Sequence, residues 1–430
     1  MKKLTLLVLL CPLFGNAQTA TPNTDSAKAA STIKYYTKQI AQTPKDATAF
    51  FKRASAQRKL ENNKAALEDY DAAIALNPKY EDALIERGLV KDALEDYKGA
   101  IADYTQVITN NPKKAIAYYN RALSKRHMDD DKAALLDFNK AIELDPKDDD
   151  FFNERGITKK RLDDYDGAIA DYTRSIALSP TAAGAYYNRG YAKSLQKKYA
   201  AAIEDYNQSI KITPNDPDGY YMRGNAKRNL EQYESAIEDY NQTLKLDPKY
   251  AEAYNSRGVT KYNLKDYKGE IEDVNKALEI DPKYDIAYYN RGLANDALNN
   301  YNESVDDYSQ FITLSPTDPD GYFKRGTARI NLEDYENSIP DLNKTIELDP
   351  KYTDAYFNRG LAKRYLEDFT GAIVDYNKAI ELDPKDGDAF NSRGVAKHYA
   401  GDDKGACVDF KKAIDLGNKY AIENQTKFCK

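Results

Sequence analysis

The chain has 430 residues, 31% of them charged and 41% hydrophobic, with 36 tyrosines and no tryptophan. This length would suggest about two or three globular domains, but an array of repeats has no single central core and escapes that limit. The net charge of −6 disfavours nucleic acid or an anionic membrane as a partner, because neither attracts an acidic protein.

The N-terminus has the pattern of a secretory signal peptide. Two lysines precede the apolar run 4–14, and a Gly-Asn-Ala sequence ends at Ala17. We expect cleavage near Ala17 and export to the periplasm or outside the cell. The run is too short to span a bilayer. A lipoprotein site at Cys11 is the alternative, although Leu10 is bulkier than the residue that such sites normally accept.

The rest of the chain repeats every 34 residues. Prolines recur at this interval without insertion or deletion, at Pro44, Pro78, Pro112, Pro146, Pro180, Pro214, Pro248, Pro282, Pro316, Pro350 and Pro384. A period in this range is typical of stacked supersecondary units. Positions are numbered below by their distance after the proline, so that Phe50 stands at +6.

Each repeat predicts two helices. A large apolar residue stands at +6, glycine at +10 in nine repeats, a small residue at +22 and usually Tyr or Phe at +26. These spacings indicate two amphipathic helices, joined by a turn near +17 and ended by the next proline. Glycine inside a helix costs about 1 kcal/mol relative to alanine, so its recurrence predicts close contact with a second helix.

These motifs identify a family. The order of aromatic, glycine, small residue, aromatic and proline over residues 47–420 resembles the tetratricopeptide repeat, with Tyr or Phe where that family often has Trp. The resemblance, to exported bacterial members, implies an all-α, right-handed superhelical solenoid of 11 tandem helix-turn-helix repeats. It also implies a concave groove lined mainly by the first helix of each repeat.

The expected organisation follows from this register. Residues 1–17 are the signal peptide, 18–46 a polar segment with an N-terminal capping helix, and 421–430 a C-terminal capping helix that covers the last repeat. The repeats are expected at 47–80, 81–114, 115–148, 149–182, 183–216, 217–250, 251–284, 285–318, 319–352, 353–386 and 387–420.

Two cysteines remain in the mature chain. Cys407 and Cys429 lie on either side of the Gly417 turn, and an antiparallel hairpin there would bring them close. Export permits a disulfide between them. The alternative is two free thiols in a small apolar contact.

Two charged positions never vary between repeats. Arginine occupies +9, at Arg53, Arg87, Arg121, Arg155, Arg189, Arg223, Arg257, Arg291, Arg325, Arg359 and Arg393. Aspartate occupies +25, at Asp69, Asp103, Asp137, Asp171, Asp205, Asp239, Asp273, Asp307, Asp341, Asp375 and Asp409. Because the turn lies midway between them, we expect an ion pair inside each hairpin rather than a row of arginines for anionic ligands.

An aromatic and amide strip is the candidate binding surface. On the first helices it comprises Tyr119, Asn120, Tyr187, Asn188, Tyr191, Tyr221, Asn225, Tyr289, Asn290, Phe323, Phe357 and Asn358. Rings supply contact area, and amides bond a peptide backbone. The alternative is that the rings only pack against the next hairpin. The carboxylate clamp of heat-shock co-chaperone members, a Lys/Asn/Arg set on successive first helices, is not expected. Asn225 occupies one clamp-like position, but the companion positions hold Tyr221 and Ser256.

One position departs from the pattern. Glu270 replaces the small residue at +22, and we expect it to point outward near the start of its helix, where a carboxylate favours the dipole.

Catalysis is not expected. The two histidines, His127 and His398, lie far apart, and neither has neighbours that suggest a triad or a metal site. No cofactor or metal is expected. The leading hypothesis is therefore a non-enzymatic scaffold that binds a protein or peptide partner. Nucleic acid is not expected as a partner, and the mature chain is not expected to span a membrane. A self-associating component of a cell-envelope assembly is the alternative, and carbohydrate capture is a weaker third hypothesis. Fold alone does not choose the partner.

Overall fold

The computed structural model describes residues 24–429, and the regular structure there is entirely α-helical, with 24 helices and no strand. The predicted signal peptide lies outside these residues. The first helices of the hairpins are α2 (Ala47–Lys59), α4 (Glu81–Ala93), α6 (Ala115–His127), α8 (Asp149–Arg161), α10 (Ala183–Leu195), α12 (Pro217–Asn229), α14 (Ala251–Asn263), α16 (Asp285–Ala297), α18 (Pro319–Asn331), α20 (Thr353–Tyr365) and α22 (Gly387–Tyr399).

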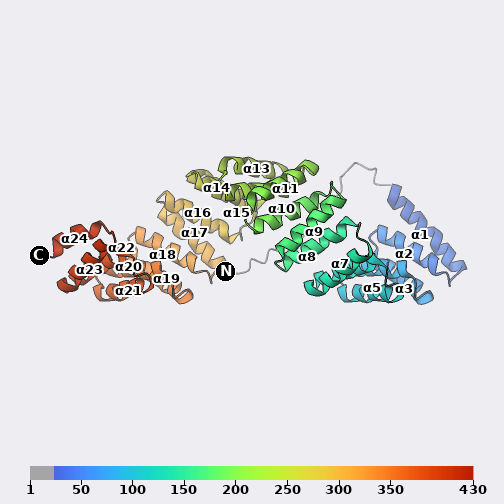
Figure 1. Ribbon diagram of the computed structural model, residues 1–430, viewed down its shortest axis with the longest axis horizontal. Coiled ribbons are helices and arrows are strands. Elements are labelled where there is room, and N and C mark those ends of the chain that lie inside the picture. Colours follow the sequence, from blue (N-terminus) through green and yellow to red (C-terminus); the bar gives the residue numbers. More distant parts are fainter. Residues whose placement is uncertain (1–23, 430) are drawn as a thin grey trace. The chain divides into compact units, whose positions relative to one another are not determined.

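The second helices are α3 (Asn63–Leu76), α5 (Tyr97–Asn110), α7 (Asp131–Leu144), α9 (Tyr165–Leu178), α11 (Tyr199–Ile212), α13 (Tyr233–Leu246), α15 (Tyr267–Ile280), α17 (Tyr301–Leu314), α19 (Tyr335–Leu348), α21 (Phe369–Leu382) and α23 (Asp403–Asp415). A single helix, α1 (Thr24–Gln42), packs on α2, and α24 (Tyr420–Phe428) packs on α23 and α22 (Figure 1). The predicted all-α array of paired helices is confirmed.

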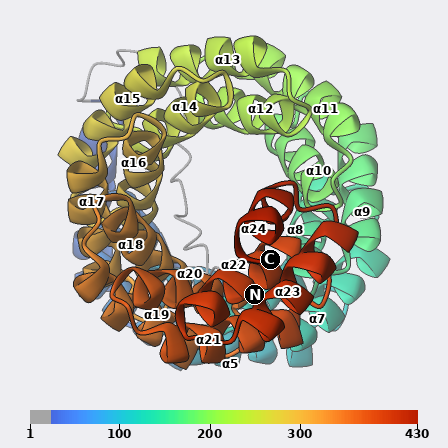
Figure 2. The same cartoon turned by 90° about the vertical axis from the view of Figure 1, so that its left-hand side faces the viewer.

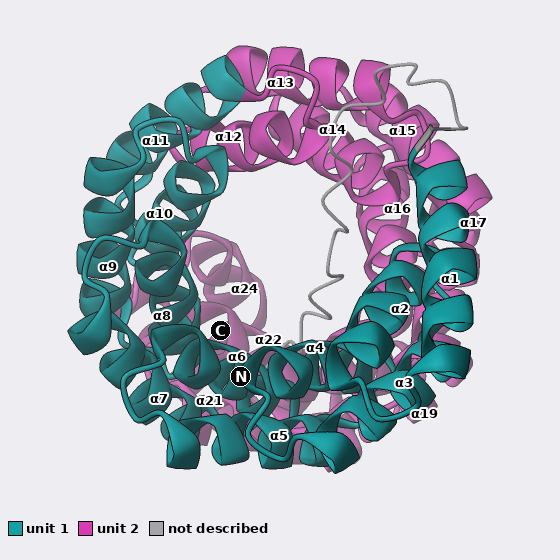
Figure 3. Ribbon diagram, turned by 90° about the vertical axis from the view of Figure 1, so that its right-hand side faces the viewer, with its two compact units in different colours: residues 1–212 teal, residues 213–430 magenta. Residues whose placement is uncertain are grey.

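The chain divides into two compact units, residues 1–212 and 213–430 (Figure 3). Unit 1 contains α1 to α11, and its first helices, such as α8 and α10, lie inside α9 and α11 (Figure 3). Unit 2 contains α12 to α24, and there α12, α14 and α16 lie inside α13, α15 and α17 (Figure 2). Successive first helices also touch, as α2 and α4 or α14 and α16 do. The first helices therefore line the inner side of each unit.

Side-chain caps and a strained turn define the hairpins. Asp46 accepts hydrogen bonds from the backbone N–H groups of Thr48 and Ala49 at the start of α2, and Asp96 accepts one from Gly99 in α5. Such caps satisfy N–H groups that have no partner inside the helix. The residue at +17 adopts a left-handed conformation in ten hairpins, with φ between 58° and 65°, although none of these residues is glycine. The last hairpin has Gly401 there, with φ of 88°.

None of the helices within residues 24–429 combines the length and the apolar character that crossing a bilayer requires.

Candidate functional site

Glycine at +10 lets the two helices of a hairpin meet. A Cβ atom on Gly88 would lie 2.6 Å from the ring of Tyr104, and one on Gly292 would lie 2.7 Å from the ring of Tyr308. Both tyrosines, at +26, are fully buried. The predicted close approach is confirmed in these glycine hairpins, because a Cβ atom at +10 would displace the ring. Where alanine stands at +10, as in Ala54 and Ala122, its methyl group is fully buried.

The arginine at +9 and the aspartate at +25 pair in every hairpin, with Nη2 to Oδ1 distances of 2.5–2.7 Å. In Arg121, Nε and Nη2 both donate to Asp137, while Nη1 donates to Thr105 Oγ1 of the preceding hairpin at 3.1 Å. In nine hairpins a Lys or Arg at +13, such as Lys125, adds a second cation to the aspartate.

The predicted ion pair is confirmed, and it also joins neighbouring hairpins. The link from Nη1 to the preceding hairpin recurs for Arg87, Arg155, Arg189, Arg257, Arg291, Arg325, Arg359 and Arg393. Arg53 bonds Thr37 of the single helix α1 in the same way. The donors of these arginines are thus engaged within the protein. Removing the aspartate would leave two cations without their partner in a half-buried position.

Glu270 contradicts its sequence-based prediction. It lies inside unit 2 with 1% of its surface exposed, and its Oε2 accepts no hydrogen bond from the described residues. Burial raises the pKa of its carboxyl to about 8. The expectation of an outward side chain was wrong because +22 faces the first helix. A Cβ atom added to Gly258 of that helix would lie 3.3 Å from the Glu270 backbone oxygen. The place of +22 in the repeat, and not the helix dipole, sets the direction of the Glu270 side chain.

The aromatic residues of the candidate strip are half-buried between hairpins. The Tyr119 ring stacks on Phe151 of the next hairpin, with ring centroids 4.8 Å apart. The Tyr221 and Tyr250 rings are tilted, with centroids 4.9 Å apart, and so are Phe323 and Tyr352 at 4.8 Å. Other strip rings lie near the +26 ring of their own hairpin, as Tyr187, Tyr289 and Phe357 do. These rings therefore pack either on the next hairpin or within their own, and each keeps part of its surface exposed.

The amides of the strip bond mostly to the neighbouring first helix. Asn188 Nδ2 donates to Asn153 Oδ1 at 3.1 Å, and Asn290 Nδ2 donates to Asn255 Oδ1 at 2.9 Å.

Two further amides have other partners. Asn358 Nδ2 donates to Thr327 Oγ1 at 3.2 Å, whereas Asn225 Oδ1 accepts from the Tyr240 hydroxyl at 2.9 Å. Asn120 is buried, with 5% of its surface exposed. Some of the side-chain amides of the strip thus hold neighbouring first helices side by side.

Position +14 of the first helices was missed in the sequence analysis. Tyrosine hydroxyls from +26 reach the first helix there: Tyr104 donates to Asp92 Oδ2 at 2.8 Å, and Tyr308 donates to Asp296 Oδ2 at 2.6 Å. Burial raises the pKa of both aspartates. The residue at +14 changes chemical type along unit 1, in the order Arg58, Asp92, Arg126, Lys160 and Ser194.

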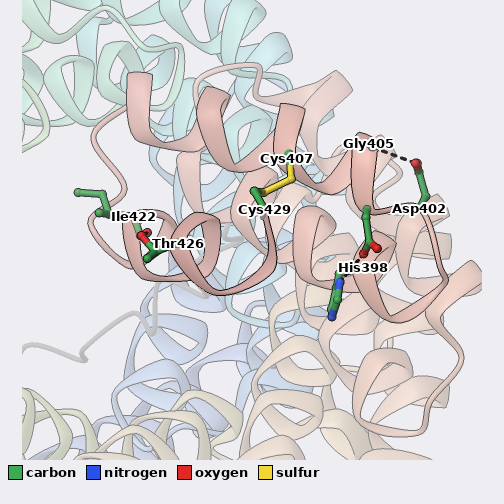
Figure 4. Close-up of a disulfide and its surroundings, with 8 residues drawn as sticks. His398, Asp402, Gly405, Cys407, Ile422, Thr426 and Cys429 are labelled. Atoms are coloured by element: carbon green, nitrogen blue, oxygen red, sulfur yellow. Dashed lines mark hydrogen bonds and ion pairs between the residues drawn. A yellow bond between two sulfur atoms is a disulfide. The ribbon is translucent and has the colours of Figure 1, made fainter.

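The C-terminal cap is tied by a disulfide between Cys407 of α23 and Cys429, which follows α24 (Figure 4). Their Cα atoms are 5.7 Å apart. Phe428 stacks on His398, with ring centroids 4.1 Å apart. In the register of the repeat, Phe428 takes the place of the glycine at +10. A further second helix could not pack there as it does in the hairpins.

Acidic runs have structural partners. Asp129 and Asp131 pair with Arg161, and Asp148 caps α8. No group of three or more metal-binding His, Cys, Asp or Glu side chains occurs within residues 24–429.

Family models match along most of the array. A model described as TPR repeat matches residues 159–196, 195–229 and 224–265. Models described as tetratricopeptide repeat match 47–80, 85–149, 251–284, 286–318, 319–352 and 353–386. Together they cover more than half of the chain. The chain belongs to the tetratricopeptide-repeat (TPR) family. TPR domains generally mediate contacts between proteins and are typically not enzymes.

Solved TPR structures resemble parts of this chain. YrrB, described as a TPR protein with an unusual peptide-binding site, is 23% identical over 44% of this chain and 99% of its own, with a TM-score of 0.41. A TPR protein from Parabacteroides merdae is 20% identical over 58% and 98%, with a TM-score of 0.44. The C-terminal part of a TPR protein from Cytophaga hutchinsonii is 18% identical over 56% and 98%, with a TM-score of 0.48. No curated protein sequence matches significantly.

Proposed function

We propose that this protein is an exported, non-enzymatic scaffold that binds an extended segment of a partner protein along the first-helix face of its units. One observation carries the proposal. The residues that hold the hairpins together, at +9, +10 and +25, are engaged inside the array in each repeat, whereas +14 of the first helices, half-buried in most repeats, differs from repeat to repeat. A surface that varies on a constant frame suits recognition.

The chemistry of this face fits a peptide. Half-buried rings such as Tyr119 and Tyr289 offer rigid contact area, and they are already held by neighbouring rings. Little side-chain freedom is then lost on binding, and this favours affinity. Polar side chains between the rings give hydrogen-bond partners to a peptide backbone.

Export rests on two features. The signal-peptide pattern of residues 1–17 directs the chain out of the cytoplasm, and the Cys407–Cys429 disulfide suits an oxidising compartment. We place the mature protein in the periplasm or outside the cell.

Self-association through the ends is the less favoured alternative. Helix α24 aligns with a first helix and α1 with a second helix, so two copies could in principle complete one hairpin. That hairpin would place Phe428 at the glycine position and Tyr35 at the aspartate position. Both changes remove contacts that close the other hairpins, and they favour a scaffold that acts as a single chain.

A peptide library tests the proposal. Random dodecamers displayed on phage are selected against the mature protein, and the affinity of selected peptides is measured by fluorescence anisotropy. Tyr119→Ile and Tyr289→Ile should weaken binding at least tenfold for peptides that bind the corresponding unit, and both should fold, because Ile85 occupies the same position. Glu238→Ala, on the exposed side of α13, is the control. Equal affinity for all three variants would refute the first-helix face as the binding surface.

A further inference from the structure

One tyrosine hydroxyl of unit 1 lacks the partner that its equivalents have. At the pair of positions +14 and +26, Tyr104 donates to Asp92, and Tyr206 bonds Ser194 at 3.2 Å. Tyr70 instead bonds Ser55 at 3.3 Å. In the fourth hairpin the same two positions hold Lys160 and Tyr172.

The Tyr172 hydroxyl has no hydrogen-bond partner among residues 24–429, although its side chain is fully buried. A buried hydroxyl without a partner is costly. The lysine at +14 cannot accept its proton, since an ammonium has only donors.

Lys160 is a half-buried cation without a carboxylate partner among the residues that the structure describes. Its Nζ lies 4.6 Å from the centroid of the Tyr191 ring on α10. The nearby Glu154 is already bound by Arg126, whose Nη2 donates to Oε2 at 2.6 Å. Burial, and then the charges of Arg126 and Arg161, lower the pKa of Lys160 to about 8.

The charged and titratable groups around Lys160 come from each neighbouring helix. Arg126 belongs to α6, Glu154 and Arg161 to α8 and Tyr191 to α10. Tyr172 of α9 stands at +26, whose tyrosine hydroxyl reaches +14 in the equivalent pairs. From α7, Asp131 is bound by Arg161. The acidic groups nearby are thus engaged with arginines, and the lysine is left with a ring face only.

We propose that Lys160 and Tyr191 form a subsite on the first-helix face of unit 1 that binds a carboxylate of the partner segment. The Lys160 ammonium is the donor, and the Tyr191 ring packs against the carbon chain that carries the carboxylate. Charge-assisted hydrogen bonds from a partly desolvated cation to a carboxylate are strong. The inference rests on the proposed function and names the chemistry that one part of the groove selects.

Lysine NMR on the full mature protein tests the subsite directly. Lysines are reductively methylated with ¹³C, and Lys160→Ser identifies the Lys160 signal by its loss. The probes are acetyl-Ala-Glu-Ala-amide, its glutamine counterpart, and acetyl-Ala-Ala-Ala with a free C-terminus. We expect the Lys160 signal to titrate near pH 8. A carboxylate probe should shift the signal and raise its midpoint, because a bound anion favours the charged amine.

The probes also identify the source of the carboxylate. A shift with the glutamate probe supports an acidic side chain, and one with the free C-terminus supports a chain end. No shift with either, or an equal shift with the glutamine probe, would overturn the subsite.

Lys160→Ser provides a folded variant for binding assays. It installs the residue of the next hairpin, where Ser194 bonds the equivalent tyrosine, so we expect unchanged or greater thermal stability. Library peptides that bear Glu or Asp should lose at least tenfold in affinity for this variant, whereas their Gln or Asn counterparts should not. Lys98→Ser, which removes an exposed charge from α5, controls for net charge.

The two proposals fail in different ways. Library peptides that bind wild type and Lys160→Ser equally, with no preference for acidic residues, would overturn the subsite and leave the scaffold function intact. A Lys160 signal that moves with the carboxylate probes while no library peptide binds would support the subsite and refute the scaffold function.

Discussion

Replacing Glu270 by alanine should stabilise the protein in a manner that depends on pH. Its carboxyl pKa rises from the ordinary value of 4.5 to about 8 in the folded protein, because the side chain is buried. A shift of this size makes the ionised form unfavourable by about 5 kcal/mol at most. Alanine stands at the same position in most other hairpins, as in Ala100 and Ala134, so the smaller side chain fits the fold.

The direction follows from the raised pKa. Folding favours the protonated carboxyl of Glu270. The stability of the wild-type protein is therefore highest below pH 4.5 with respect to this group, and it falls as the pH rises towards 8. Relative to Glu270→Ala, the free energy of unfolding of the wild-type protein should therefore fall by about 3 kcal/mol by pH 7 and by about 5 kcal/mol above pH 8.

Urea unfolding at pH 5, 7 and 9 measures this difference. Glu270→Gln serves as the uncharged variant of similar size, and Glu272→Ala, on the exposed side of α15, serves as the control. The reasoning is refuted if wild type and Glu270→Ala show parallel stability profiles over this pH range.

Four other substitutions probe the frame. Asp239→Asn should cost about 3–5 kcal/mol, because it leaves half-buried cations without their carboxylate; an unchanged melting temperature would contradict the structural role of the pair. Glu231→Gly should stabilise by up to about 1 kcal/mol by relieving a left-handed residue, and a loss of stability in urea would contradict this. Gly292→Ala should destabilise, because the new Cβ meets a buried ring, whereas Gly184→Ala, with open space around it, should not; thermal unfolding compares the two. Cys407→Ser should lower the stability of the C-terminal hairpin by about 3 kcal/mol, because the disulfide closes a loop of 22 residues. Amide hydrogen exchange in α24 should become faster in this variant, and an unchanged exchange rate would contradict the prediction.

The fold follows from residues that recur because one hairpin needs them. Gly292, for example, leaves room for the ring of Tyr308 against the first helix, and Arg121 supplies the cation for Asp137, whose carboxylate is buried. Such constraints lie within one repeat and are repeated along the chain, so the pattern shows them directly.

The candidate face is less predictable because its contacts join different repeats. The pairing of Asn188 with Asn153 depends on how adjacent first helices align, and this alignment has no separate signature in the sequence. The direction of Glu270 was predicted wrongly because one charged residue gave no sign that its side chain points inward, as the alanines at +22 of other hairpins do. The unpartnered Tyr172 could have been found by comparing +14 with +26 in each repeat, since cations, Lys160 and Arg364, stand at +14 in the hairpins of Tyr172 and Tyr376, whose hydroxyls have no hydrogen-bond partner among residues 24–429.

The central claim is that the first-helix face binds an extended peptide, and photo-crosslinking tests it most directly. A selected dodecamer that carries a photoreactive group at successive positions is crosslinked to the mature protein, and the modified residues are mapped by mass spectrometry. The account predicts crosslinks that progress along first helices, through residues such as Tyr119, Lys160 and Tyr191. Crosslinks confined to the exposed sides of second helices, for example around Glu238, would contradict it.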